Sequence, residues 1–323
     1  MSARTVFMFS GQGSQYHQMG QQLFAEHSVF REWMRHLDAV AHRLAGRSVI
    51  EAVYGAGKSV SFDRTLLTHP AIFMVEYALA QCLIDEGVRP DVTLGASLGS
   101  FAAAVVAGHC DVEDAMAAVL SQAAALEAAC PRGGMIAVLA EPSLYEEEFL
   151  RRRSEMAGVN FHSHFALAAA HGELDAIEAW LKQRGVAHQR LAVSFAFHSQ
   201  WIDSARAHWR APVPAPGGAL LPLVCCARAA THGRLPDDFF WQAVRQPIRF
   251  DETVAHLEKQ GPHRYIDLGP SGTLATFVKY GLPDTSRSTA HALLTPYGQD
   301  RKNLAALVGT RAQVDRPAAL EQV

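Results

Sequence analysis

The sequence has few cysteines, and their arrangement suggests neither a cross-link nor a thiolate metal site. There are five of them, an odd number, and no two are spaced C-x-x-C. Disulfide frameworks use even, dense sets of cysteines, and thiolate zinc sites use closely paired ones. We therefore expect no disulfide and no metal, and we interpret the five as small core residues, at Cys82, Cys110, Cys130, Cys225 and Cys226.

The chain also lacks an excess of charge. Its formal net charge is -3, and it has no polybasic segment. Nucleic-acid faces and anionic membrane surfaces both require clustered basic residues, so neither partner is expected. We see no apolar run long enough for a spanning helix, and the start MSARTVFMFSGQGSQ lacks the pattern of a secretory signal. A cytoplasmic location is the resulting expectation.

What is present is the composition of a globular enzyme. The chain has 323 residues, of which 49% are hydrophobic and 19% charged. This length is enough for two domains, or for one large domain that carries an insertion.

One short stretch has the pattern of a nucleophile elbow. Residues 94–101 read LGASLGSF, with an apolar run before them and an alanine-rich helical segment after them. Glycines on both sides of Ser97 allow a sharp turn between strand and helix, which exposes the serine hydroxyl. The pattern is weak by itself, because glycine and serine are common in surface turns.

The middle of the chain has a different character. From Met135, apolar strand-like runs alternate with helical ones in the order β-α-β-α-β, and the helices are expected at 143–156 and 173–185. This order predicts a small ferredoxin-like unit inserted into a larger domain. The larger domain is expected to begin with a strand at 5–10, followed by a helix from about Gln21 to Ala45.

Three other patterns are rejected as cofactor or metal sites. GQGSQY at 11–16 has Tyr16 where a dinucleotide fingerprint requires its third glycine. GAGKS at 55–59 has Ala52 where a phosphate-binding loop requires its first glycine. His162 and His164 have no third ligand at suitable spacing, so a metal is not expected there.

A serine nucleophile needs a base to take its proton, and histidine is the usual one. The tract AFHS places His198 after the last strand of the inserted unit. With sixteen histidines in the chain, chemistry alone does not select it.

Five motifs together resemble one known family. In chain order they are FMFSGQGSQYHQMG, GASLG, VSFAFHS, FFWQAVRQPIRF and YIDLGPSGTL. Their order and approximate spacing are similar to those of the malonyl-CoA:acyl carrier protein transacylase family, which includes the acyltransferase domains of polyketide and fatty acid synthases. The resemblance extends to about residue 300.

The resemblance implies a fold and its divisions. It implies an α/β-hydrolase-like large subdomain at 1–131 and 199–314, with a ferredoxin-like small subdomain at 132–198 and the active site in the cleft between them. Residues 315–323 are polar and alanine-rich, and we expect them to be a flexible tail.

The resemblance also implies a mechanism. Ser97 attacks a thioester, and His198 takes its proton and later activates the acyl acceptor. The backbone N–H groups of Gln12 and Leu98 form the oxyanion hole. No bound cofactor is implied, because the acyl group arrives on the phosphopantetheine of an acyl carrier protein, the expected partner.

One departure from the family pattern bears on the substrate. Members that load malonyl groups carry an arginine about twenty-five residues after the serine, where Gln122 stands here, and no arginine or lysine occurs from Ser97 to Pro131. A glutamine amide offers a carboxylate no countercharge. Loading of a dicarboxylic acyl group is therefore disfavoured.

Three further departures predict a remodelled acyl pocket. Ala96 replaces the usual histidine before the nucleophile, and His162 replaces an asparagine near the acyl group. The family's asparagine or glutamine, which helps to orient the catalytic histidine by a carbonyl contact, falls at Ala243, beside Gln242, so we leave the partner of His198 open. Phe197 keeps the Phe-His pair of malonyl-type members, so this tract does not decide specificity alone.

Three functions remain open from the sequence. The preferred one is an acyl hydrolase that removes neutral acyl groups from acyl carrier proteins as proofreading in a trans-acyltransferase polyketide pathway. A transferase that passes the same acyl-enzyme to another carrier is the first alternative. A non-catalytic carrier-docking subunit is the second, and it has no need of Ser97, His198 and the glycine loop together.

Overall fold

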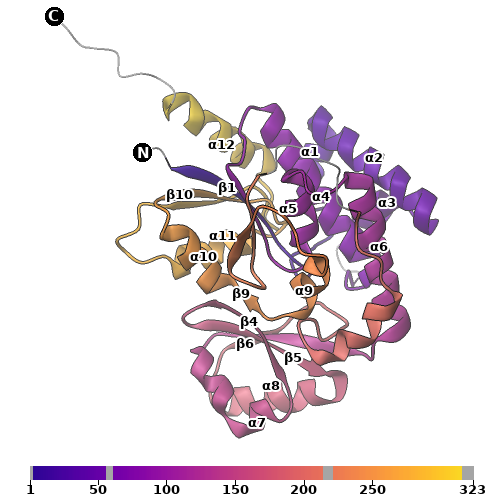
Figure 1. The fold of residues 1–323 in the computed structure, drawn as a ribbon, viewed down its shortest axis with the longest axis vertical. Helices are drawn as coiled ribbons and strands as arrows, with labels where there is room; N and C mark the ends of the chain where they lie inside the picture. The colour runs from indigo at the N-terminus through magenta and orange to yellow at the C-terminus, as the bar shows by residue number, and fades with distance from the viewer. Residues whose placement is uncertain (1–2, 56–60, 214–220, 315–323) are drawn as a thin grey trace, which may run out of the picture.

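The computed structural model describes residues 3–55, 61–213 and 221–314, and its two β-sheets are flanked by helices (Figure 1). The larger sheet has six strands in the order β11-β10-β1-β2-β7-β8. Only the β7–β8 pair is antiparallel within it. Its strands are β1 (Arg4–Phe9), β2 (Val92–Gly95), β7 (Leu223–Cys225), β8 (Ala230–His232), β10 (His263–Asp267) and β11 (Thr289–Ala292).

The apolar run of β1 is continuous because both faces of this sheet are covered. Phe7 and Phe9 belong to one hydrophobic cluster, whereas Val6 and Met8 belong to the other. Successive side chains of a strand point to opposite faces, so a strand between two helical layers needs apolar residues at every position. The strand expected at 5–10 is confirmed.

The helices around the large sheet form the two covering layers. The first cluster includes side chains of α2 (Ser28–Ala45), α4 (Thr65–Asp85), α5 (Gly99–Val106) and α6 (Val112–Ala129). The second includes side chains of α10 (Phe250–Glu258) and α11 (Thr273–Gly281). The remaining helices are α1 (Gln21–Glu26), α3 (Val49–Tyr54), α9 (Phe239–Arg245), α12 (Asp300–Val314) and a 3-10 helix at Gln200–His208.

The smaller sheet forms a separate layer at the lower end of Figure 1, with α7 (Glu148–Arg151) and α8 (Leu174–Gln183) beside it. Its order is β6-β3-β5-β4-β9. The strands are β3 (Gly133–Val138), β4 (Glu155–Phe161), β5 (His164–Ala170), β6 (His188–Arg190) and β9 (Ile248–Arg249). The segment from β3 to β6 thus has the β-α-β-β-α-β order of a ferredoxin-like unit.

The expected mixed α/β fold is confirmed, while the subdomain boundaries stay a prediction. Strands β3 to β6 fall within 132–198, but β9 joins the smaller sheet from further along the chain, parallel to β4. The tail expected at 315–323 lies outside the described residues, as does GAGKS after Gly55.

The helix expected at 143–156 is shorter than predicted and broken into two pieces. That segment forms a 3-10 helix at Pro142–Glu146 and the short α7, and β4 begins at Glu155. Its Glu and Arg residues favour a helix locally, but β4 is held between β5 and β9. A Cβ at Gly158 would lie 2.7 Å from that of Ile248, so close pairing with β9 requires this glycine.

Two other expected elements are shorter than predicted. The helix expected from Gln21 to Ala45 is divided into α1 and α2, because His27 is extended and its side chain caps α2 by accepting from the N–H of Phe30. The last strand in the predicted β-α-β-α-β order is limited to the three residues of β6.

Helix α4 is long and apolar enough to cross a membrane, judged by length and composition alone. This corrects our expectation that no apolar run is long enough to span one. However, 83% of its apolar 18-residue stretch is buried inside the fold, where α4 contacts α2, α5 and α6. A core helix passes the same test, and α4 is interpreted as one. The five cysteines are all free, and only Cys130 is not fully buried.

Candidate active site

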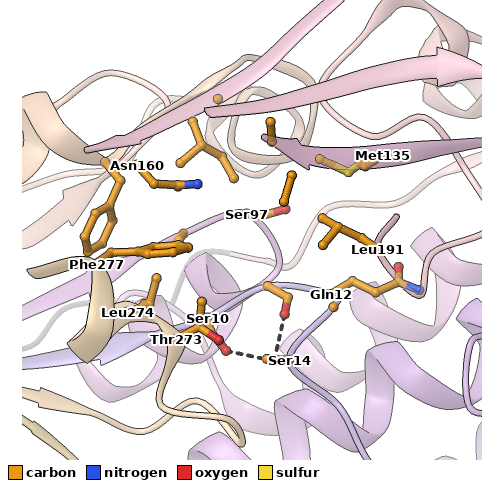
Figure 2. A pocket seen from close by; sticks show the side chains of 18 of the residues that line it. Ser10, Gln12, Ser14, Ser97, Met135, Asn160, Leu191, Thr273, Leu274 and Phe277 are labelled. Atoms are coloured by element: carbon orange, nitrogen blue, oxygen red, sulfur yellow. Dashed lines mark hydrogen bonds between the residues drawn. The ribbon is translucent and has the colours of Figure 1, made fainter. Parts of the chain in front are cut away.

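A cavity of about 300 Å³ lies over the carboxyl ends of β1 and β2. Figure 2 shows Ser97 near its centre, with Asn160 and Phe277 towards one end and Met135 and Leu191 on the opposite side. Strands of the small sheet, the loop after β1 and helix α11 all contribute to its wall. In open α/β sheets this position is where ligands bind.

Ser97 occupies a strained turn between β2 and α5, as the sequence predicts. Its φ is 55, a value that is uncommon for a residue other than glycine. A Cβ at Gly95 would lie 2.4 Å from the Cα of Ser100, and one at Gly99 would lie 2.1 Å from the carbonyl oxygen of Phe9. Both glycines of GASLG are therefore required for the chain to turn here and present the hydroxyl.

His198 contacts Ser97 directly, although 101 positions separate them in the chain. Its Nε2 lies 2.9 Å from Ser97 Oγ, and its Nδ1 lies 2.7 Å from the carbonyl oxygen of Gln246. A carbonyl only accepts, so Nδ1 carries the hydrogen and Nε2 is left to accept the hydroxyl proton. This is the tautomer that a general base needs.

The surroundings of His198 keep its imidazole neutral. Burial lowers its pKa from the usual 6.5 to about 4, against the hydrogen bond to the Gln246 carbonyl, and the charge of Arg245 lowers it further. Above that pH the ring is uncharged and able to take a proton from Ser97.

The structure supplies the orienting partner of His198 that the sequence left open. It is the main-chain carbonyl of Gln246, at the end of α9. The side chain of Gln242 points elsewhere and donates to Asp238 at 2.9 Å. The contact uses the main chain, so the side-chain type carries little signal in the sequence.

The loop from Ser10 to Ser14 passes close to Ser97. A Cβ at Gly11 would lie only 2.8 Å from that of Ser97, so glycine is needed at this approach. Within the described part of the chain, the N–H groups of Gln12 and Leu98 donate to no protein acceptor. They are free for the oxyanion role, which stays a prediction.

No charged side chain lines this cavity among the described residues. The wall is mainly aliphatic and aromatic, and its polar side chains are serines, threonine, amides and histidines. The apolar lining comprises Ala96, Met135, Ala137, Ala166, Leu191, Phe197, Ile248, Phe250, Leu274 and Phe277.

The predicted specificity residues divide into two groups. Ala96 and Phe197 line the cavity, as expected. Gln122 is 3% exposed but is not in the lining, and neither its amide nitrogen nor its amide oxygen has a hydrogen-bond partner among the described residues. His162 is exposed in the turn between β4 and β5 and is not in the lining either, so its expected place at the acyl group is wrong.

The structure places Asn160 and His164 in the lining instead, and the sequence reasoning missed both as site residues. The Asn160 amide nitrogen lies 2.9 Å from His164 Nδ1. The register of β4 against β5 shifts between Val159 and Phe161, and such a bulge redirects side chains. Alternation read from the sequence cannot locate that shift. Among the described residues no group of three or more potential ligands could hold a metal ion.

Comparison with known proteins places this site in context. The acyl transferase domain family matches residues 6–318. The polyketide biosynthesis acyltransferase homolog PksD of Bacillus subtilis is 42% identical over 309 residues, which cover 94% of this chain and 95% of that protein. The acyl transferase domain of SpnD is similar in structure, with a TM-score of 0.84 and 26% identity over 96% of this chain and 77% of that one. The MCAT of Streptococcus pneumoniae has a TM-score of 0.76 and 27% identity over 95% of this chain and all, 100%, of that one.

Proposed function

We propose that this chain, which belongs to the acyl transferase domain family, is a hydrolase that removes neutral acyl groups from acyl carrier proteins. The family and its relatives connect it with acyl transfer in polyketide biosynthesis. Such domains need no bound cofactor, because the acyl group is carried on the phosphopantetheine of the carrier. Proofreading in a trans-acyltransferase pathway is the role that we assign to it.

The proposed first half-reaction acylates the serine. Ser97 Oγ attacks the thioester carbonyl carbon while His198 Nε2 takes the hydroxyl proton. The N–H groups of Gln12 and Leu98 donate to the oxyanion, and donors fixed before the reaction stabilise it without reorganising. The C–S bond then breaks, and the leaving sulfur takes the proton from His198 as the carrier thiol departs.

The second half-reaction decides between hydrolase and transferase. In hydrolysis, His198 takes a proton from water, the hydroxide oxygen attacks the acyl-serine ester, and Ser97 leaves as an alcohol with that proton. The products are a carboxylic acid and free enzyme. In transfer, a second carrier thiol replaces water at the same step.

The observation that carries the proposal is the absence of any charged side chain in the cavity lining of the described residues. A malonyl carboxylate there would lose its hydration without gaining a cation, and this costs several kcal/mol. An acetyl group or a longer neutral chain has no such cost.

Transfer is the second candidate, and the observation in its favour is the relationship to proteins described as acyltransferase homologs. A non-catalytic docking subunit is less consistent with the site, since it has no use for a serine and a histidine at 2.9 Å. Cytoplasmic location and the lack of nucleic-acid and membrane partners remain predictions.

A panel of carrier proteins tests the proposal. Acetyl, longer neutral and malonyl carriers are incubated with the enzyme, with and without a second unloaded carrier, and free acid and acylated second carrier are quantified by mass spectrometry. We expect neutral thioesters to be lost as free acid and malonyl carrier to remain. Movement of the acyl group mainly to the second carrier would favour the transferase.

The matched control is Ser97→Ala, which removes the attacking oxygen. The wild-type enzyme is expected to show an acyl adduct on the peptide that contains Ser97, and the variant none. Wild-type protein without any adduct would favour the docking subunit.

A further inference from the structure

We propose that Glu76 and His69, which lie on one face of helix α4, are positioning residues that orient the Gln12 N–H for the oxyanion. The inference deepens the proposed function and rests on its Ser97 acyl-enzyme. Seven positions separate the two residues, about two turns, so they share a helix face. Both are fully buried in a helix whose buried side chains are mostly apolar.

The first link runs from Glu76 to the loop. Glu76 Oε1 accepts from the backbone N–H of Ser10 at 2.6 Å, and Ser10 Oγ lies 3.0 Å from the same oxygen. Burial raises the pKa of this carboxyl group well above its usual range, in spite of the hydrogen bond from the Ser10 N–H. A neutral carboxyl group still supplies the accepting oxygen that Ser10 needs.

The link continues to the peptide that carries the proposed donor. Ser10 Oγ donates to Ser14 Oγ at 2.9 Å, and Ser14 Oγ donates to the carbonyl oxygen of Gly11 at 2.8 Å (Figure 2). The Gly11 carbonyl and the Gln12 N–H belong to one planar peptide unit, in which they point in opposite directions. Holding the carbonyl on Ser14 therefore fixes the direction of the Gln12 N–H.

The second link holds the side chain of Gln12. His69 Nε2 lies 2.7 Å from Gln12 Oε1, and Gln12 Nε2 donates to Thr68 Oγ1 at 3.2 Å. An amide oxygen only accepts, so His69 Nε2 carries the hydrogen. Burial lowers the pKa of His69 to about 3, which agrees with a neutral donor. The His69 ring also packs against Phe197, with centroids 5.6 Å apart, next to the catalytic histidine.

These contacts converge on one peptide from two directions. The bonds from Glu76 end at the carbonyl side of the Gly11–Gln12 unit, and those from His69 and Thr68 end on the Gln12 side chain. An oxyanion donor is effective only when it is already aimed at the developing charge. Helix α4 thus orients the Gln12 N–H, just as the Gln246 carbonyl orients the His198 ring.

The experiment compares Glu76→Leu with Glu76→Gln. Leucine removes the acceptor for Ser10, whereas glutamine keeps a neutral carbonyl oxygen in nearly the same place. We expect Glu76→Leu to slow single-turnover acylation of Ser97 by at least about tenfold, approaching the 10²-fold loss of an oxyanion donor, with KM nearly unchanged. Glu76→Gln should restore the rate to within about threefold. A folded Glu76→Leu enzyme with the wild-type rate would overturn the proposal, as would a Gln variant as slow as the Leu variant.

A second variant keeps the test valid if Glu76→Leu does not fold. Ser14→Ala removes the hydroxyl that holds the Gly11 carbonyl and leaves the core unchanged, and it too should slow acylation by about tenfold. Ser204→Ala is the matched control, because its hydroxyl also donates to a carbonyl, that of Ala129 at 2.8 Å, away from the cavity. Equal rates for the Ser14 and Ser204 variants would contradict the inference.

A fluorophosphonate probe separates this inference from the proposed function. The probe labels an activated serine without any carrier protein, and its attack also places negative charge on an oxygen at the reacting centre. We expect the labelling rates of the Glu76 and Ser14 variants to follow the acylation rates. Wild-type enzyme that is labelled but hydrolyses no acyl carrier would refute the proposed function while still reporting the effect of Glu76. Equal labelling of all variants would refute the positioning role.

Discussion

Ser97 and His198 both have left-handed backbones, with φ values of 55 and 61, and their side chains meet at 2.9 Å. Such conformations cost non-glycine residues roughly 1 kcal/mol or more, and they persist where the surrounding structure determines them. Here close packing at Gly95 and Gly99 holds the first, and a 3.2 Å hydrogen bond from the His198 N–H to the Val244 carbonyl helps to hold the second. Strain at both members of one pair agrees with a reactive site.

The pH dependence of acylation should reflect the buried state of His198. Its pKa is lowered to about 4, and only the neutral ring accepts a proton, so the acylation rate should stay nearly constant from pH 8 down to about 5 and fall below that. The acylation rate is measured at each pH by quenching the reaction at timed intervals and quantifying acylated Ser97 by mass spectrometry. A midpoint near 6.5 would show that the ring is solvated in the working enzyme.

That measurement needs a check on folding. His198 is neutral in the folded protein but takes up a proton below about pH 6.5 when unfolded, so stability falls as the pH drops from 6.5 towards 4. Circular dichroism at each pH therefore accompanies the rates, and only the range in which the chain is folded is interpreted.

Gly11→Ala should impair catalysis more than stability. The new methyl group would lie 2.8 Å from the Cβ of Ser97, so the loop or the nucleophile has to shift. Moving the reacting groups by about 1 Å is enough to lower the rate by about 10²-fold. Gly172→Ala is the control, because no atom lies within 4 Å of its added Cβ and its φ is not positive. Equal activities of the two variants would show that the approach to Ser97 is adjustable.

Gln122→Arg tests whether this position reaches the acyl group. We expect the charge to raise malonyl-enzyme formation relative to acetyl-enzyme formation, because a guanidinium pairs with a carboxylate. Competition between the two acyl carriers, read as the ratio of adducts on Ser97, measures the effect. An unchanged ratio would show that position 122 stays behind the cavity wall, where the native amide lies.

Gln122→Met should stabilise the fold. Neither polar atom of the amide has a partner among the described residues, and burying such a group costs about 1–3 kcal/mol. Methionine has a similar size and no such groups, so the free energy of unfolding in urea should rise by about that amount. Gln242→Met is the comparison, since its amide donates to Asp238 and its loss should bring no gain. A less stable Gln122→Met protein would mean that the amide has a partner such as water.

Much of the fold was predictable from local patterns. The apolar run of β1 and the glycines around Ser97 both depend on neighbouring residues, so the sequence indicates them correctly. Strand β4 was missed because its Glu- and Arg-rich approach favours a helix, and only pairing with β5 and β9 makes the strand.

The candidate site, too, was predictable only in part. The order of the motifs singled out Ser97 and His198, whose contact the structure then supplied. The role of Gln246 was not predictable, because a main-chain carbonyl leaves no mark on the residue type. Asn160 and His164 were missed because a bulge changes which side chains face the cavity.

The sequence by itself determined the turn that exposes an alcohol, the glycine loop beside it and the lack of a basic residue on the following helix. Only the tertiary structure decided which carbonyl sets the tautomer of His198, and which buried helix supports the loop. The reason is physical: local sterics and propensity act between neighbours in the chain, whereas hydrogen-bond partners 48 or 66 positions apart meet only when the sheets and helices have packed.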